Sequence, residues 1–293
     1  MLFEGNISSK DGERFWNYGT DFLKAGRSRI ILLMQGMKGM MIMTTLKGLV
    51  LKETDSGESS KSICVLTAEM GVIYIYVRGG RKSSKTTSAT QSFSYSELCF
   101  EEKKNAKGQV SRYLNSSEPV KLFYNIRLDA AKVALASYFS ELLIYSGTEG
   151  QNCAEVMRLA LNTLYFLDED KMETDLLKCV FEFRLLCELG MRPKLVGCAF
   201  CFKYEDDKMH FNYLEDRLEC QDCCPNPDSV HTIILDKQLL YIVRFIALTE
   251  YEKLFYFKIS DKYLKKLTEF TEKFVWYHFN RRFGALDFYK MLK

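Results

Sequence analysis

Residues 71–82 read GVIYIYVRGGRK, and this stretch decides how the first half of the chain is expected to fold. Aliphatic side chains alternate in it with Tyr74 and Tyr76. Such an alternation of period two is typical of a strand that buries one face and exposes the other. The glycine pair at 79–80 then favours a turn. The stretch is therefore predicted to be a half-buried strand that leads into a basic turn.

Further short runs of strand-forming residues lie between Leu46 and Phe123, separated by turn residues. The clearest runs are GLVL at 48–51, ICVL at 63–66 and FSYSEL at 93–98. Together with the opening stretch they predict roughly five strands in about 80 residues, which is typical of a small β-barrel or sandwich.

After residue 125 the hydrophobic period changes from that of strands to that of helices. Helical segments are expected around 135–143, 156–164, 176–189, 239–246 and 261–280. The segment 176–189 is apolar nearly all round, so it is expected to be the most buried of them. The second half of the chain is therefore predicted to be mainly helical.

Two cysteine pairs interrupt the helical region, each with the spacing Cys-x2-Cys and with eighteen residues between the pairs. Their members are Cys198, Cys201, Cys220 and Cys223. This pattern is typical of a four-cysteine zinc site, because each tight turn directs two sulfurs at one ion. Four protein ligands leave no open position, so one structural Zn²⁺ is expected. Cys224 is an alternative fourth ligand, and free or redox-active cysteines are the alternative interpretation.

The region from Gly71 to Ser96 contains no Asp or Glu, whereas four cations fall in it. These cations are Arg78, Arg81, Lys82 and Lys85. Tyr74 and Tyr76 share one strand face with Arg78, and rings with cations suit single-stranded nucleic acid. Phe93 and Tyr95 are expected to add to this surface. The pattern leaves the alternative open that the tyrosines cover the core and the cations lie in a solvated loop.

Composition and missing motifs limit the classes of function. The net charge is only +3, and ten cysteines scattered through a chain with an ample core favour a reducing cytoplasm. The early apolar run at 30–34 is far shorter than the roughly 20 residues that span a bilayer, so no membrane association is expected. Phosphate-binding loops, nucleophile elbows and His-Glu-x-x-His pairs do not occur in the sequence. A non-enzymatic cytoplasmic protein is predicted.

Residues 1–42 form an atypical extension with mixed charge and weak periodicity. A start codon assigned too far upstream is one explanation, with Met40, Met41 and Met43 as alternative starts. A natural extension without a fold of its own is the other.

The order of these features resembles the bacterial DNA repair protein RecO. The resemblance covers roughly Thr45 to Ile246. The order of the matching stretches along the chain is more specific than any single stretch, except for the cysteine pattern. The matching stretches include GLVLK at 48–52, GVIYIYVRGGRK at 71–82, QSFSY at 91–95, FEFRLL at 181–186 and CAFC at 198–201. One departure is Asp216-Arg217, which stands where the family often has a glycine pair before the third cysteine.

The resemblance implies an α+β chain with an N-terminal OB-fold barrel over 43–124 and a helical domain over 125–293, with a zinc-binding insertion over 195–230. It implies a mediator of recombinational DNA repair that binds single- and double-stranded DNA and anneals strands. The implied partners are RecR and single-strand binding protein, with which it loads RecA, at the bacterial nucleoid in the cytoplasm. It also makes the four cations between 78 and 85 candidates for DNA contact.

Two other functions remain open at this point. The first is a zinc-containing scaffold for protein interactions without nucleic-acid binding. The second is a zinc-dependent nuclease, which requires an open metal position.

Overall fold

The computed structural model describes residues 29–33, 41–56, 60–79 and 84–293. Contacts divide the chain into two compact units. The first unit comprises the described residues up to Glu169 together with Phe283–Lys293, and the second comprises Asp170–Arg282. Strand-rich and helical parts are largely segregated along the chain, so the predicted α+β class is confirmed. In the part of the chain that the structure describes, no helix is both long and apolar enough to cross a membrane.

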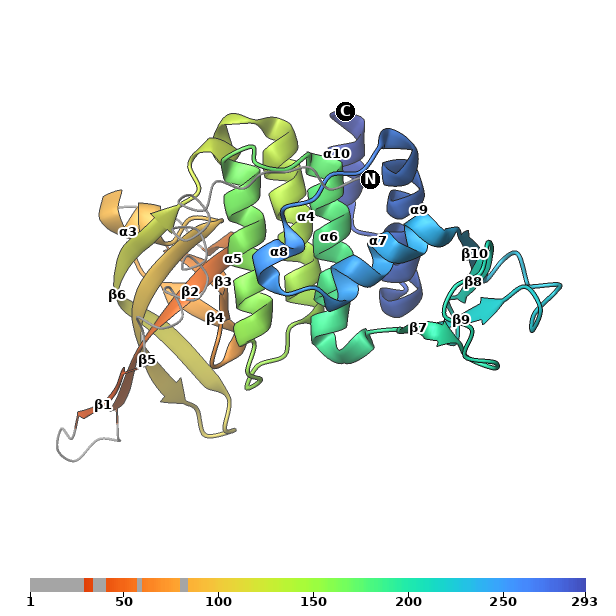
Figure 1. The fold of residues 1–293 in the computed structure, drawn as a ribbon. Helices are drawn as coiled ribbons and strands as arrows, with labels where there is room; N and C mark the ends of the chain where they lie inside the picture. Colours follow the sequence, from red (N-terminus) through yellow and green to blue (C-terminus); the bar gives the residue numbers. More distant parts are fainter. Residues whose placement is uncertain (1–28, 34–40, 57–59, 80–83) are drawn as a thin grey trace. The chain divides into compact units, whose positions relative to one another are not determined.

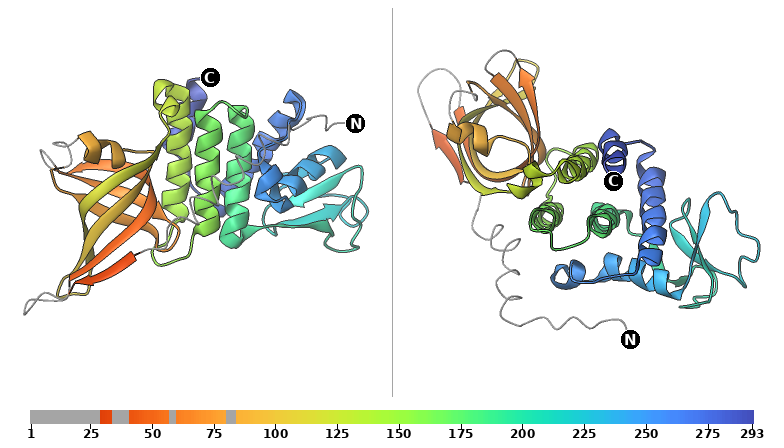
Figure 2. Two further views of the ribbon diagram at one scale, coloured as in Figure 1. Left: turned by 60° about the vertical axis from the view of Figure 1, so that its left-hand side comes forward. Right: turned by 90° about the horizontal axis from the view of Figure 1, so that it is seen from above.

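The first unit contains a closed barrel, which curves around its core in Figures 1 and 2. The barrel strands are β2 (Met41–Ser56), β3 (Ser60–Thr67), β4 (Gly71–Val77), β5 (Ser94–Lys104) and β6 (Val110–Leu122). Strand β1 (Arg29–Leu33) precedes them and pairs with β2. Strands β2 to β6 pair in the order β2-β3-β4-β6-β5, and β5 pairs back with β2. Helix α3 (Ser84–Ala89) lies between β4 and β5 in the sequence. This five-stranded closure confirms the predicted OB-fold barrel.

Alternation along the strands fills the barrel core. In β4, Ile73, Ile75 and Val77 are buried, whereas Tyr74 is exposed and Tyr76 is half-buried. Leu46, Val50, Ile63, Val65, Leu98 and Phe100 complete the buried cluster. In β4 the buried aliphatic side chains thus alternate with the two tyrosines, as the period of two predicted.

Besides α3, three described helices belong to the same unit as the barrel: α4 (Ala130–Ser146), α5 (Ala154–Asp168) and α10 (Gly284–Met291), with the short 3₁₀ turn η1 (Asn125–Leu128) before α4. The loop between α4 and α5 is fastened to the β3–β4 turn, because the Gly150 N–H donates to Met70 O at 2.9 Å and the Cys153 N–H to Ala68 O at 2.8 Å. The barrel and these helices therefore form one compact body. The predicted domain boundary at 124/125 remains a prediction.

The second unit combines helices with a small sheet, drawn in teal in Figure 1. Its helices are α6 (Thr174–Leu186), the π-helical turn η2 (Cys187–Met191), α7 (Lys237–Leu248), α8 (Tyr251–Leu254) and α9 (Asp261–Phe279). Its strands are β7 (Lys194–Cys198), β8 (Met209–Asn212), β9 (Arg217–Cys220) and β10 (Thr232–Leu235), in the order β10-β8-β9-β7. As predicted, α6 is buried nearly all round, and Phe183 packs edge-on against Phe270 and Phe274 of α9.

The predicted extension 1–42 lies mostly outside the described residues. Its described parts are strand β1 and the first residues of β2, which pair antiparallel. Neither strand segment was expected from the weak periodicity of this region.

Candidate metal centre and nucleic-acid interface

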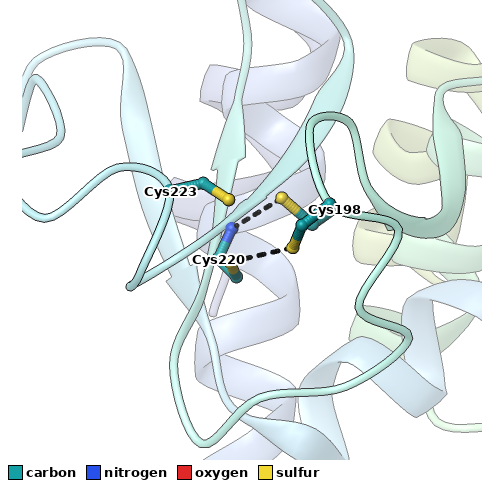
Figure 3. A group of neighbouring side chains, drawn as sticks. Cys198, Cys220 and Cys223 are labelled. Atoms are coloured by element: carbon teal, nitrogen blue, oxygen red, sulfur yellow. Dashed lines mark hydrogen bonds between the residues drawn. The ribbon is translucent and has the colours of Figure 1, made fainter.

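The four predicted zinc ligands come together in the small sheet of the second unit. Cys198 ends β7 and Cys220 ends β9, and the turns that follow them carry Cys201 and Cys223. The four sulfurs all lie within 4.8 Å of one another. Figure 3 shows the labelled Cys198, Cys220 and Cys223 converging from the two turns. We call Cys198–Cys201 the first knuckle and Cys220–Cys223 the second knuckle.

Backbone hydrogen bonds set the shape of the first knuckle. The Phe202 N–H donates to Cys198 O at 3.0 Å, and the Cys198 N–H donates to Lys203 O at 2.9 Å. Gly197 permits this tight return, because a Cβ there would lie 2.9 Å from the carbonyl oxygens of both Phe202 and Lys203. In the second knuckle the Cys224 N–H donates to Cys220 O at 2.9 Å. Both knuckles are therefore shaped by the backbone so that their sulfurs face a common point.

The electrostatics of the cluster favour a cation. Burial opposes ionisation of Cys198, but N–H donors from Cys201, Phe200 and Cys220 outweigh it and lower the pKa of this thiol from 9.0 to about 6. The pKa of Cys223 is raised, first through its hydrogen bonds with Cys201 and Cys220. The Cys198 thiolate thus forms readily, whereas the neighbouring thiols disfavour ionisation of Cys223. A bound dication removes this conflict, and four sulfurs are the donor set that Zn²⁺ accepts in structural sites.

Cys224, His210 and His231 lie outside the group of four sulfurs. The group of four contains Cys223 and not its neighbour Cys224 within the described residues. His210 Nε2 lies 3.1 Å from Gln221 Oε1, and His231 Nδ1 lies 2.7 Å from the Tyr277 hydroxyl. The four cysteines therefore fit a closed zinc module.

The outer face of the barrel carries the predicted aromatic and basic residues of β4. Tyr74 is 58% exposed, and Arg78 is exposed directly after the strand. The Arg78 guanidinium lies 4.4 Å from the ring centroid of Tyr113, and the rings of Tyr76 and Tyr113 meet edge-on at 5.9 Å. Among the described residues no carboxylate forms an ion pair with Arg78. The structure thus places both Tyr76 and Arg78 against the ring of Tyr113.

Sequence reasoning missed three residues of this face. Tyr113 lies on β6 opposite Tyr76, where β4 and β6 close the barrel. Lys103 Nζ lies 5.3 Å from the Tyr113 ring centroid, and Lys52 stands in the same cross-strand row as Tyr74 through Cys64. No local pattern signals Tyr113, because β6 lacks strand-forming periodicity, and Lys52 and Lys103 join the face only through pairing of distant strands. We call Lys52, Tyr74, Tyr76, Arg78, Lys103 and Tyr113 the aromatic-basic face.

The remaining predicted basic residues lie beyond what the structure describes. Arg81 and Lys82 fall outside the described residues. Lys85 belongs to α3, and its side chain is likewise outside the described part of the chain.

The prediction that Phe93 and Tyr95 add to the binding surface is wrong. Their side chains are only 6% and 2% exposed, and burial raises the pKa of Tyr95. The serines between and after them face α3, since Ser94 Oγ donates to Ser88 O and Ser96 Oγ to Ala89 O. Helix α3 lies against β5, so this end of the strand is covered instead of open.

The chain combines an OB-type barrel with a four-cysteine module. It therefore belongs to the class of OB-fold proteins that also carry a separate thiolate site suited to zinc. Comparison with known families then identifies the group within that class. The family described as Recombination protein O N terminal matches residues 40–123, and Recombination protein O C terminal matches residues 127–287. The chain belongs to the recombination protein O family, as the resemblance predicted.

Curated relatives agree with this assignment. The DNA repair protein RecO of Acetivibrio thermocellus is 28% identical over 248 residues, which cover 84% of this chain and 95% of the relative. The protein of the same name from Alkaliphilus metalliredigens is 25% identical over 84% of this chain and 98% of its own length. That of Bacillus pumilus is 31% identical over 60% of this chain and 67% of its own length.

Proposed function

We propose that this protein binds DNA and anneals complementary strands in recombinational DNA repair, with the barrel as its DNA-binding domain. The observation that carries the proposal is the aromatic-basic face on an OB-type barrel, in a chain whose family is named for recombination. Its partners in this proposal are single- and double-stranded DNA, RecR and single-strand binding protein, with which it loads RecA. It acts in the bacterial cytoplasm at the nucleoid, and residues 43–124 form the DNA-binding domain.

The face suits unpaired strands for two physical reasons. An exposed ring such as Tyr74 stacks on a base, which contributes on the order of 1–3 kcal/mol, whatever the base. Arg78 and Lys52 supply positive charge for phosphates beside the rings, whereas Lys103 is paired with Glu101 at 2.8 Å. Arg81, Lys82 and Lys85 extend the positive charge in this proposal. Annealing needs charge neutralisation and displayed bases but no bond chemistry, so the proposed activity is non-enzymatic.

Four thiolates hold one structural Zn²⁺ in this proposal, through Cys198, Cys201, Cys220 and Cys223. The ion stabilises the insertion 195–230 within a helical domain over 125–293. It supplies no open position for a substrate.

Charge reversal on the face tests the DNA-binding proposal. Arg78→Glu is expected to weaken binding to a labelled single strand and to reduce the log–log salt slope by about 0.7, the contribution of one lost phosphate contact. Fluorescence anisotropy at several salt concentrations measures both quantities.

Lys265→Glu is the matched control, because Lys265 is an exposed cation on α9 in the second unit. It changes the net charge equally but belongs to the other compact unit, which does not contain the barrel strands. Equal losses in the two variants, or an unchanged slope with Arg78→Glu, would reject the assignment of this face.

A protein-interaction scaffold is the second candidate, and the surface of the first knuckle favours it. Val196, Phe200 and Phe202 are exposed there, and acidic side chains outnumber basic ones in residues 195–230. Such a surface repels phosphates and suits a protein partner. An annealing assay with strands coated by single-strand binding protein separates the candidates, since a pure scaffold leaves the annealing rate unchanged.

A further inference from the structure

Arg244 is a cation buried beside the first knuckle. It lies on α7, outside the cysteine-bearing segment, and only 6% of the residue is exposed. A guanidinium removed from water needs acceptors for its N–H groups, so its partners report what it holds in place.

Its hydrogen bonds reach both sides of the first knuckle. The Nε–H donates to Leu195 O at 2.8 Å, and one terminal nitrogen donates to Val196 O at 3.2 Å and to Tyr204 O at 2.6 Å. Leu195 precedes Cys198 by three residues, and Tyr204 follows Cys201 by three residues. One side chain therefore joins the strand that enters the knuckle to the segment that leaves it.

Two further contacts hold the guanidinium in this position. The ring of Tyr204 covers it, with the centroid 3.9 Å from Cζ. The carboxylate of Glu205 lies 3.8 Å from the other terminal nitrogen. The planar fork of arginine can serve two carbonyls on one segment and a third on the other, whereas a lysine ammonium is a point charge on a flexible stem.

We propose that Arg244 is a positioning residue for the metal centre, which holds the two ends of the first knuckle at the separation that directs Cys198 and Cys201 at one ion. The inference rests on the proposed zinc site. When the knuckle is held before the metal arrives, less backbone freedom is lost on binding, so affinity is higher. Groups that orient ligands from outside the coordination sphere typically change metal affinity by about 10- to 100-fold.

The same unit offers a matched control in Arg184. Its guanidinium donates to the carbonyls of Ile246, Ala247 and Thr249 at 3.1, 3.3 and 2.9 Å, and lies 4.8 Å from the Tyr251 ring. It thus makes the same kinds of contact as Arg244, but at the C-terminal end of α7. Its loss disturbs the same helix without releasing the knuckle.

The experiment measures Zn²⁺ affinity of the full chain by competition with a chromophoric chelator, together with the visible spectrum of the Co²⁺-substituted protein. Arg244→Met and Arg244→Lys are each expected to lower affinity by about 10-fold or more and to shift the Co²⁺ bands that report tetrahedral thiolate geometry. Arg244→Lys keeps the charge, so it separates geometry from electrostatics. Arg184→Met is expected to lower the melting temperature but to leave affinity and spectrum unchanged.

Tyr204→Ala is the second variant, to be used if the arginine variants do not fold. It is expected to fold because it removes only the exposed ring above the guanidinium. A loss of a few-fold in affinity is expected from it. Wild-type affinity in the Arg244 variants, or in Tyr204→Ala if those do not fold, overturns the positioning role, as does an equal loss in Arg184→Met. A wild-type chain that holds neither Zn²⁺ nor Co²⁺ overturns the metal centre itself, and the inference with it.

Discussion

Gly71 is a residue at which backbone conformation and packing both require glycine. Its φ is +68°, and a Cβ there would lie 2.1 Å from the carbonyl oxygen of Thr148 in the α4–α5 loop. Gly79 adopts a similar φ of +62°, but nothing lies within 4 Å of its Cβ position. Substitution of Gly79 therefore costs only the left-handed backbone conformation, whereas substitution of Gly71 also costs the close contact with Thr148.

Gly71→Ala is expected to destabilise the first unit more than Gly79→Ala does. Both variants place an L-residue in the left-handed region, at roughly 1–2 kcal/mol. Gly71→Ala adds an overlap that forces the α4–α5 loop away from the barrel, on the order of 1–3 kcal/mol more. Urea unfolding followed by hydrogen exchange of the barrel strands measures the difference, and equal midpoints for the two variants would contradict the close approach.

A second residue-scale feature is the buried Lys178, which pairs with Glu182 at 3.1 Å and Glu272 at 2.9 Å. Burial lowers the pKa of Lys178, but these carboxylates outweigh it and raise the pKa overall. The resulting stability is present below the unfolded pKa near 10.5 and is lost only as pH rises through the higher folded value. Around neutral pH the Lys178–Glu272 ion pair therefore joins α6 to α9, and its contribution to stability does not change with pH.

Among the elements, β6 depends most on its neighbours. Its sequence VSRYLNSSEPVKL is polar and contains a proline, so its residues do not indicate a strand. It forms because β5 supplies a long antiparallel partner and β4 closes the barrel from the other side. That closure is also what places Tyr113 beside Arg78.

Helix α7, which carries Arg244, begins at an N-cap formed by Asp236. The Asp236 carboxylate accepts from the Leu239 N–H at 3.0 Å and from Lys266 Nζ. Burial raises the pKa of this group, but the Lys266 and Leu239 donors outweigh it and lower the pKa below 3.8. A carboxylate whose folded pKa is lowered stabilises the fold above its unfolded pKa and loses that effect as pH falls through the folded value.

Asp236→Ala is expected to destabilise the second unit by about 1 kcal/mol, with the same difference throughout the range from about pH 5 to pH 8. Asp236→Asn retains an N-cap oxygen and is expected to lose less. Thermal melts across this range measure both variants. A wild-type advantage that changes between about pH 5 and pH 8 would mean that another group titrates with the cap.

For the whole molecule, the metal is expected to stabilise the sheet of the second unit. Four thiolates that hold Zn²⁺ are expected to add folding energy to the hydrophobic contacts of this small sheet. Leu195 and Leu218 are buried beside the first knuckle, whereas Val196, Phe200 and Phe202 are exposed on it.

Chelation or Cys223→Ser is expected to release the metal and to make residues 195–230 sensitive to limited proteolysis, while the barrel stays resistant. Elemental analysis gives the zinc content, and mass spectrometry of the fragments locates the cuts. Cys224→Ser is the control and is expected to retain one zinc per chain. Loss of zinc in Cys224→Ser with retention in Cys223→Ser would reverse the assignment of the fourth ligand.

The sequence by itself determined the features that depend on local spacing. Cys-x2-Cys pairs direct sulfurs through one turn, and the period of two in residues 71–78 separates a buried from an exposed face, so both were predictable. The helical segments that became α4, α5 and α9 follow from the same kind of local argument, because their hydrophobic period is that of a helix.

Only the tertiary structure decided which segments meet and which surfaces are covered. Residues distant in the sequence meet in the pairing of β6, in the contact of Arg78 with the Tyr113 ring and in the hydrogen bonds of Arg244 to the first knuckle. The burial of Phe93 and Tyr95 likewise depends on the tertiary structure. Hydrogen bonding and burial at such places depend on the partner that the fold supplies, and the pattern of one segment carries no information about that partner.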